Sequence, residues 1–124
     1  MRCPFAIWSP TVKQGYGTDN ANLKLGVIVH SAEGYRNPML NILDGGLKKS
    51  WHFSVFKVGD VFQHVDTDNI SWASGGYEAN RRFWNIECEG VVGEPLTEPQ
   101  YQVLLRVVKW LWEVHHMAEP QRQV

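Results

Sequence analysis

The chain has 124 residues, of which 44% are hydrophobic, and this length and composition suit one folded domain. Its formal net charge of −1 gives no global basic field, which argues against nucleic acid as a partner. No run of about 18 apolar residues could span a membrane, and the N-terminal stretch lacks the apolar core of a secretory signal. We therefore expect a monomeric domain, made in the cytoplasm, with no membrane or nucleic-acid partner.

The N-terminal part carries few signs of regular structure. Residues 9–22 are rich in glycine, asparagine, threonine and aspartate, which is typical of a surface loop. We therefore expect residues 1–24 to form an N-terminal loop region. The two cysteines, Cys3 and Cys88, lie far apart and outside any C-x-x-C pair, so they indicate neither a disulfide framework nor a cysteine zinc site.

His30 is the first candidate functional residue. It ends the hydrophobic, strand-like run of residues 25–29, and the small polar pair Ser31-Ala32 follows it. A histidine at the exit of a buried strand has an apolar floor beneath it and a loop above it, which can hold a neutral imidazole ready to bind a metal. The alternative is a core histidine that is hydrogen-bonded to a backbone carbonyl, and this segment alone leaves both open.

The middle of the chain contains a predicted hairpin. Residues 51–57 and 61–65 are two β-rich runs joined by a three-residue turn, so we expect them to pair antiparallel. In the first run His52 alternates with aromatic neighbours and therefore faces away from them. Its imidazole could line the same cleft as His30 or hydrogen-bond the backbone, and the pattern does not decide between these roles.

Two helices are predicted around these strands. Pro38 is placed to open a short helix that ends at Gly45-Gly46. Further on, residues 97–100 (Thr-Glu-Pro-Gln) supply an N-cap, an early proline and a capping-box glutamine, and an apolar face at helical spacing follows. The expected fold is therefore α/β (or α+β), with a mixed central β-sheet flanked by helices. We expect His115 and His116 to cap the end of the long helix.

A further strand is predicted over residues 83–89. Along it Ile86 and Cys88 share one face, while Glu87 and Glu89 share the other. A carboxylate that faces a cleft is the residue type that takes a proton from a metal-bound water. A solvated strand surface explains the pair as well on pattern alone.

In this order, the motifs resemble those of the type-2 N-acetylmuramoyl-L-alanine amidases, zinc enzymes that share their fold with peptidoglycan recognition proteins and phage lysins. The resemblance covers residues 25–116. It rests on five segments, which are residues 26–32 (GVIVHSA), residues 50–53 with 59–65 (SWHF and GDVFQHV), residues 71–75 (SWASG), residues 85–90 (NIECEG) and residues 96–101 (LTEPQY). Each segment is a weak signal singly, but five in the same order are a strong one.

The resemblance implies a peptidoglycan hydrolase that cleaves the amide between N-acetylmuramic acid and L-alanine by zinc-activated water. It makes His30 the first zinc ligand and Glu87 the general base. It also places Trp72 in the substrate groove, although a core position is the alternative. His52 and Glu89, which we expect on the same cleft, complete the predicted substrate contacts.

One departure from the family pattern bears on zinc. Family members place a second histidine after the long helix and a third ligand several residues later, and this chain stops first. We therefore expect residues 1–124 to be one amidase-like domain, truncated at its C-terminus and of phage or bacterial origin, with an incomplete zinc site and released to act on the cell wall. The alternatives are a non-catalytic peptidoglycan-binding module, or a zinc site completed by another chain or by His52 or His115.

Overall fold

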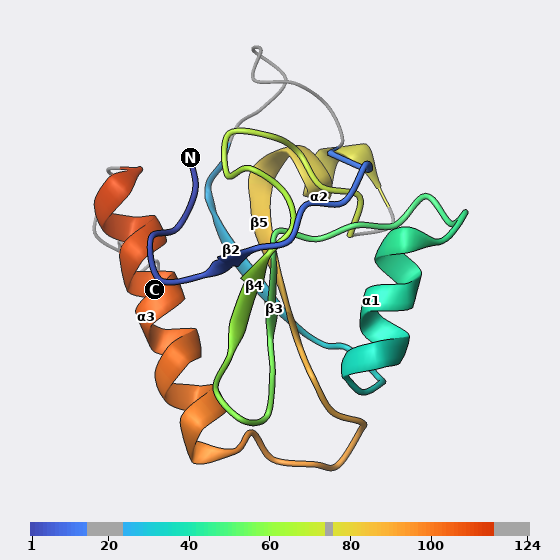
Figure 1. Cartoon of the computed structure of the whole chain (residues 1–124). Coiled ribbons are helices and arrows are strands. Elements are labelled where there is room, and N and C mark those ends of the chain that lie inside the picture. The colour runs from blue at the N-terminus through green and yellow to red at the C-terminus, as the bar shows by residue number, and fades with distance from the viewer. Residues whose placement is uncertain (15–23, 74–75, 116–124) are drawn as a thin grey trace.

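The computed structural model describes residues 1–14, 24–73 and 76–115 and contains one mixed sheet flanked by helices (Figure 1). Its strands are β1 (Ile7–Trp8), β2 (Gly26–Ser31), β3 (Phe53–Val55), β4 (Val61–Gln63) and β5 (Phe83–Cys88), in the spatial order β1-β4-β3-β5-β2. Its helices are α1 (Arg36–Asp44), α2 (Tyr77–Arg82) and α3 (Glu98–Val114). The fold class expected from the sequence is confirmed. No helix in the described part of the chain has both the length and the apolar character needed to cross a membrane.

The register of the central strands decides which side chains meet. β5 lies between β2 and β3 and runs parallel to both, while β3 and β4 form the predicted antiparallel hairpin. His30 of β2 is the direct partner of Glu87, and Glu87 is the direct partner of Ser54 on β3. Because partners in register point to the same face of a sheet, these three side chains share one face.

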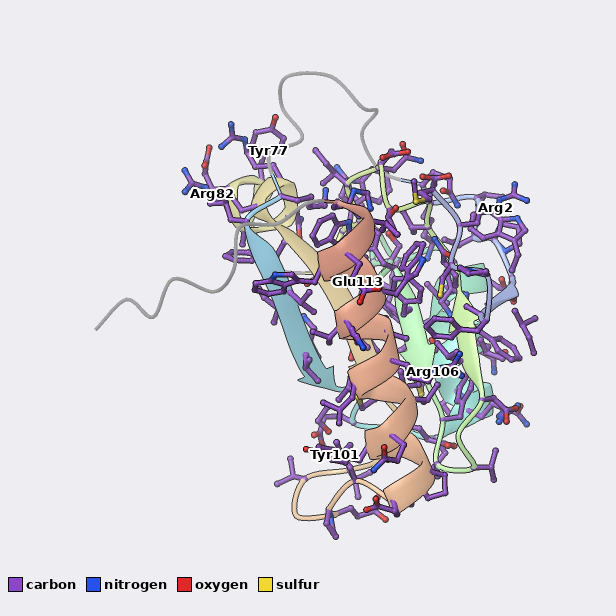
Figure 2. The ribbon with its side chains drawn as sticks, turned by 90° about the vertical axis from the view of Figure 1, so that its left-hand side faces the viewer. Arg2, Tyr77, Arg82, Tyr101, Arg106 and Glu113 are labelled. Carbon is purple, nitrogen blue, oxygen red and sulfur yellow. The ribbon has the colours of Figure 1, made fainter. Side chains whose placement is uncertain are left out.

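The two faces of the sheet differ in character. One face packs under α3 in a cluster of eleven buried residues, which are Cys3, Phe53, Val55, Val61, Trp84, Ile86, Cys88, Val103, Leu104, Val107 and Leu111. The other face is covered by α1, whose Met39 and Leu43 pack with Trp51 and Phe56 in a smaller cluster. Figure 1 shows the two helices on opposite sides of the sheet, and Figure 2 looks onto the outer side of α3, along which Tyr101, Arg106 and Glu113 lie.

The helix boundaries follow local sequence signals. Thr97 accepts from the backbone N–H of Gln100 and forms the predicted capping box, so α3 begins where the sequence places it. α1 begins at Arg36, two residues before Pro38, and the backbone N–H of Gly45 closes it by donating to the Ile42 carbonyl.

One expectation about the N-terminal region is corrected. Ile7 and Trp8 form β1, which pairs in parallel with Phe62 and Gln63 of β4, inside the region that we expected to be loop. A strand of two residues is too short to show a hydrophobic period, so only the pairing reveals it. The predicted loop at residues 9–22 falls largely outside the described residues.

A buried polar network joins the hairpin to the N-terminal segment. His64 is 1% exposed, and its Nδ1–H donates to the Ser9 carbonyl at 2.8 Å, so its Nε2 accepts from the Ser54 hydroxyl at 2.7 Å. The Trp51 indole N–H also donates to Ser54 Oγ, at 2.8 Å. Burial lowers the pKa of His64 to about 4, so near pH 7 its imidazole is neutral and carries its one proton on Nδ1. Burial likewise lowers the pKa of His52 to about 3.

These buried histidines predict an acid-sensitive core. Below about pH 6.5 the unfolded chain binds protons at His52 and His64 that the folded chain does not bind. The free energy of unfolding should therefore decrease as the pH is lowered. For His64 alone the decrease should be about 3 kcal/mol between pH 7 and pH 4. His64→Gln should flatten this dependence by that amount. Urea unfolding followed by tryptophan fluorescence across this pH range measures it, and parallel curves for the two proteins would contradict the assignment.

Candidate active site

The carboxyl ends of two parallel strands bring together the two residues predicted to carry the chemistry. His30 lies near the end of β2 and Glu87 near the end of β5, and the two are partners in register. In α/β sheets this edge is where ligands bind, because loops leave the strands there. The sequence predicts both residues, and the strand pairing makes them neighbours.

Glu87 has a buried carboxyl group with no structural partner among the described residues. It is 5% exposed, and it makes no hydrogen bond or ion pair with any residue that the structure describes. Burial raises its pKa, while His30 and Lys49 act in the opposite direction through their charge. A buried acid with a perturbed pKa and no structural partner is suited to proton transfer.

Asn85 is a third member of this site and is not among the predicted residues. It lies two positions before Glu87 on β5, so it points to the same face, and it is fully buried. Its Oδ1 lies 2.9 Å from Nε2 of His30. The available sequence signal was the alternation of residues 83–88, which places one polar residue on the Glu87 face within an otherwise apolar strand.

Trp72, a predicted substrate contact, is half-buried in the loop before α2. Its backbone is tied to Ser50, whose N–H donates to the Trp72 carbonyl at 3.2 Å. The Lys48 ammonium lies 4.7 Å from the indole ring. Because Lys49, the next residue, acts on Glu87 through its charge, residues 48–50 connect the Trp72 loop with the site. Substrate contact by Trp72 stays a prediction.

Glu89 has a structural role, and its predicted substrate contact stays a prediction. Its two carboxylate oxygens accept from the backbone N–H groups of Arg36 and Lys57, each at 2.8 Å. Arg36 is the first residue of α1, and its backbone N–H has no partner within the helix. A carboxylate at this position accepts from that N–H and interacts favourably with the helix dipole. The sequence predicts a strand through Glu89, but β5 ends at Cys88, and the Glu89 carboxylate is bound by these two amides.

His52 is also a structural residue, so the backbone alternative is the one observed. Its side chain is buried, its Nε2 lies 2.9 Å from the Asn69 carbonyl, and its Nδ1 accepts from the Asn85 backbone N–H at 3.1 Å. Both ring nitrogens are therefore occupied by main-chain groups. This leaves no nitrogen of His52 for a substrate or a metal.

The residues described do not by themselves form a zinc site. A catalytic zinc is usually held by three protein ligands. Within residues 1–14, 24–73 and 76–115, no three His, Cys, Asp or Glu side chains gather in a way that could hold a metal ion. His115 ends α3, but its Nε2 lies 2.9 Å from Thr67 Oγ1 and its ring packs on Trp84, so it does not complete a site at His30. His116 lies outside the described residues.

Comparison with known proteins identifies the family. The model of the N-acetylmuramoyl-L-alanine amidase family matches residues 19–124. The match covers more than half of the chain and includes the strands that carry His30 and Glu87. The chain therefore belongs to the N-acetylmuramoyl-L-alanine amidase family. Among curated protein sequences, none matches it significantly.

Solved structures agree on the fold. A selenomethionine derivative of AmpD has a TM-score of 0.75 at 19% identity, and the match covers 98% of this chain and 87% of that one. The endolysin N-acetylmuramoyl-L-alanine amidase LysCS from Clostridium intestinale has a TM-score of 0.63 at 16% identity, and the match covers 95% of this chain and 80% of the LysCS chain. AmpD from Citrobacter freundii has a TM-score of 0.62 at 22% identity, with coverages of 93% and 74%. At these identities the likeness shows the fold.

The donor set leads to a prediction about metal content. After dialysis against micromolar zinc, the purified chain should retain clearly less than one zinc ion per molecule, because the described residues offer His30 without two further ligands. Atomic absorption gives the stoichiometry, and His30→Ala should reduce the retained zinc to background. Stoichiometric zinc that resists a chelator would overturn the prediction.

Proposed function

We propose that this chain hydrolyses the amide bond between N-acetylmuramic acid and L-alanine in peptidoglycan, with Glu87 as the residue that transfers the proton. The observation that carries this proposal is the state of Glu87, which is buried, is paired in register with His30, and has no hydrogen bond or ion pair to a described residue. Membership of the N-acetylmuramoyl-L-alanine amidase family supports the substrate class.

The proposed reaction needs one acid–base group that works twice. A water molecule attacks the carbonyl carbon of the lactyl group on N-acetylmuramic acid, and Glu87 accepts a proton from that water as the C–O bond forms. Glu87 then gives the proton to the nitrogen of L-alanine as the C–N bond breaks, leaving a carboxylate and a free amino terminus. Burial raises the pKa of Glu87, which favours return of the proton, while the charge of Lys49 acts in the opposite direction and favours the carboxylate.

Zinc, the cofactor that the family resemblance implies, would need ligands beyond the described residues in addition to His30. Zinc bound in such a site would act as a Lewis acid on the scissile carbonyl and would lower the pKa of bound water. The proton transfers assigned to Glu87 are derived from its burial and its neighbours, and they stand independently of how zinc is held.

Replacement of the base tests the proposed reaction. Glu87→Gln keeps the size of the side chain but removes proton transfer, so the rate of amide cleavage should fall about 100-fold or more. The assay incubates the full chain with purified cell walls in zinc-containing buffer and measures newly released amino termini of L-alanine, which separates amide cleavage from glycosidase action.

The matched control is Glu113→Gln, because Glu113 lies on the outer side of α3, across the sheet from the site (Figure 2). This variant should cleave at the rate of the unmodified chain. Near-normal turnover by Glu87→Gln would remove Glu87 from the mechanism. No release by the unmodified chain, together with retained binding to cell walls, would replace hydrolysis by the second function below.

The second candidate function is binding of peptidoglycan without cleavage. It is favoured by a specific observation, namely that the described residues offer no three-ligand metal cluster. A recognition module would keep the groove of the family and would not need a complete zinc site. The unused Glu87 carboxyl group favours the enzyme instead.

Binding to cell walls can be measured under either function. Trp72→Ala should weaken sedimentation with insoluble peptidoglycan by about 1 to 3 kcal/mol, which is about 5- to 150-fold in the association constant, because one aromatic contact is lost. Trp8→Ala is the matched control, since Trp8 lies on β1 at the opposite edge of the sheet from β2. Equal binding by the two variants would place Trp72 in the core.

A further inference from the structure

The orientation of the Asn85 side chain is fixed by groups other than His30. Its Nδ2 lies 3.0 Å from Ser71 Oγ and 3.4 Å from the Phe83 carbonyl oxygen. A carbonyl oxygen can only accept, so the amide nitrogen must lie on this side of Asn85. The amide oxygen, Oδ1, consequently faces His30.

The orientation of Asn85 determines which nitrogen of His30 carries the proton. Oδ1 can only accept, and it lies 2.9 Å from Nε2 of His30, so Nε2 must be the donor. A neutral imidazole has one N–H, and its lone pair is then on Nδ1. Nδ1 makes no hydrogen bond with any residue in the described part of the chain. The fold thus occupies one ring nitrogen and leaves the other for a ligand.

His52 explains why Asn85 is held so firmly. The His52 backbone N–H donates to the Asn85 carbonyl at 3.0 Å, and the His52 ring accepts from the Asn85 N–H at 3.1 Å. Because the His52 ring in turn lies 2.9 Å from the Asn69 carbonyl, it cannot rotate without breaking a buried hydrogen bond. Contacts other than the one with His30 therefore hold both the main chain and the side chain of Asn85 in place.

We propose that Asn85 is a positioning residue, which fixes the imidazole of His30 in one orientation with its proton on Nε2 and leaves the Nδ1 lone pair to bind a ligand. The inference deepens the proposed function and rests on it for the role of Nδ1. Hydrogen-bond partners of this kind set the tautomer and the ring orientation of functional histidines in other sites. Here the partner comes from the same strand as Glu87, so one strand supplies the acid–base group and orients its neighbour.

The test begins with the unmodified chain, free of substrate and metal. Two-bond ¹H–¹⁵N correlation spectra of histidine-labelled protein at about pH 8 report which ring nitrogen of His30 is protonated. We expect the proton on Nε2, in slow exchange with solvent, and a single ring orientation. A proton on Nδ1 of His30 would overturn the proposal without any variant.

Variants then test the role of Asn85 itself. Asn85→Ala should lose the slowly exchanging Nε2–H signal of His30, while Asn85→Asp, which keeps an acceptor oxygen in place, should retain it. Asn41→Ala, on the exposed side of α1, is the control and should leave the signal unchanged. An unchanged signal in folded Asn85→Ala would contradict the proposal, and if that variant does not fold, loss of the signal in folded Asn85→Asp would do so.

Kinetics separates this inference from the proposed function. Asn85→Ala should lower kcat about 10- to 100-fold with little change in KM, and Asn85→Asp should recover part of that loss. If the unmodified chain proves inactive but its spectra show the expected proton on Nε2, the proposed function fails while the placement of His30 by Asn85 stands. Equal kcat values for Asn85→Ala and the unmodified chain would limit Asn85 to a structural role.

Discussion

The parallel pairing of β2 with β5 is the interaction on which the site depends. Side chains alternate along a strand, so a slip of one residue in either strand would turn its entire set of side chains to the opposite face. The register that places His30 beside Glu87 also places Trp84 and Ile86 beneath α3. The hydrophobic core therefore holds His30 and Glu87 side by side, because a slipped strand would bury carboxylate and amide groups among the apolar side chains beneath α3.

The sheet face that carries Glu87, opposite the face under α3, contains several buried polar side chains. Asn85, His52, His64 and Ser54 are all buried there, and each has a hydrogen-bond partner that compensates for lost hydration. Glu87 differs from these neighbours, since its carboxyl group has no such partner among the described residues. This contrast within one network is the observation on which the proposed role of Glu87 rests.

The fold persists at low sequence identity for a physical reason. AmpD superimposes with a TM-score of 0.75 although only 19% of the aligned residues are identical. A sheet and its helices need side chains of suitable size and hydrophobic pattern, and many sequences meet that requirement. A site, by contrast, needs particular atoms at particular register positions, so a likeness in fold does not by itself extend to the roles of His30 and Glu87. Asn85 belongs to an intermediate level, where a local hydrogen-bond arrangement orients a functional residue.

The sequence by itself determined the mixed sheet, the hairpin and the capping box of α3, because these depend on hydrophobic period, turn residues and local motifs. It also predicted His30 and Glu87 as site residues, and the structure shows them as neighbours in register. Only the tertiary structure decided the partners of each polar group. Alternation indicates the face on which Glu89 and His52 lie, but it does not show that backbone amides of other segments occupy them. For the same reason the sequence did not reveal Asn85. Its side chain contacts Ser71 and His30, which lie 14 and 55 positions away from it along the chain.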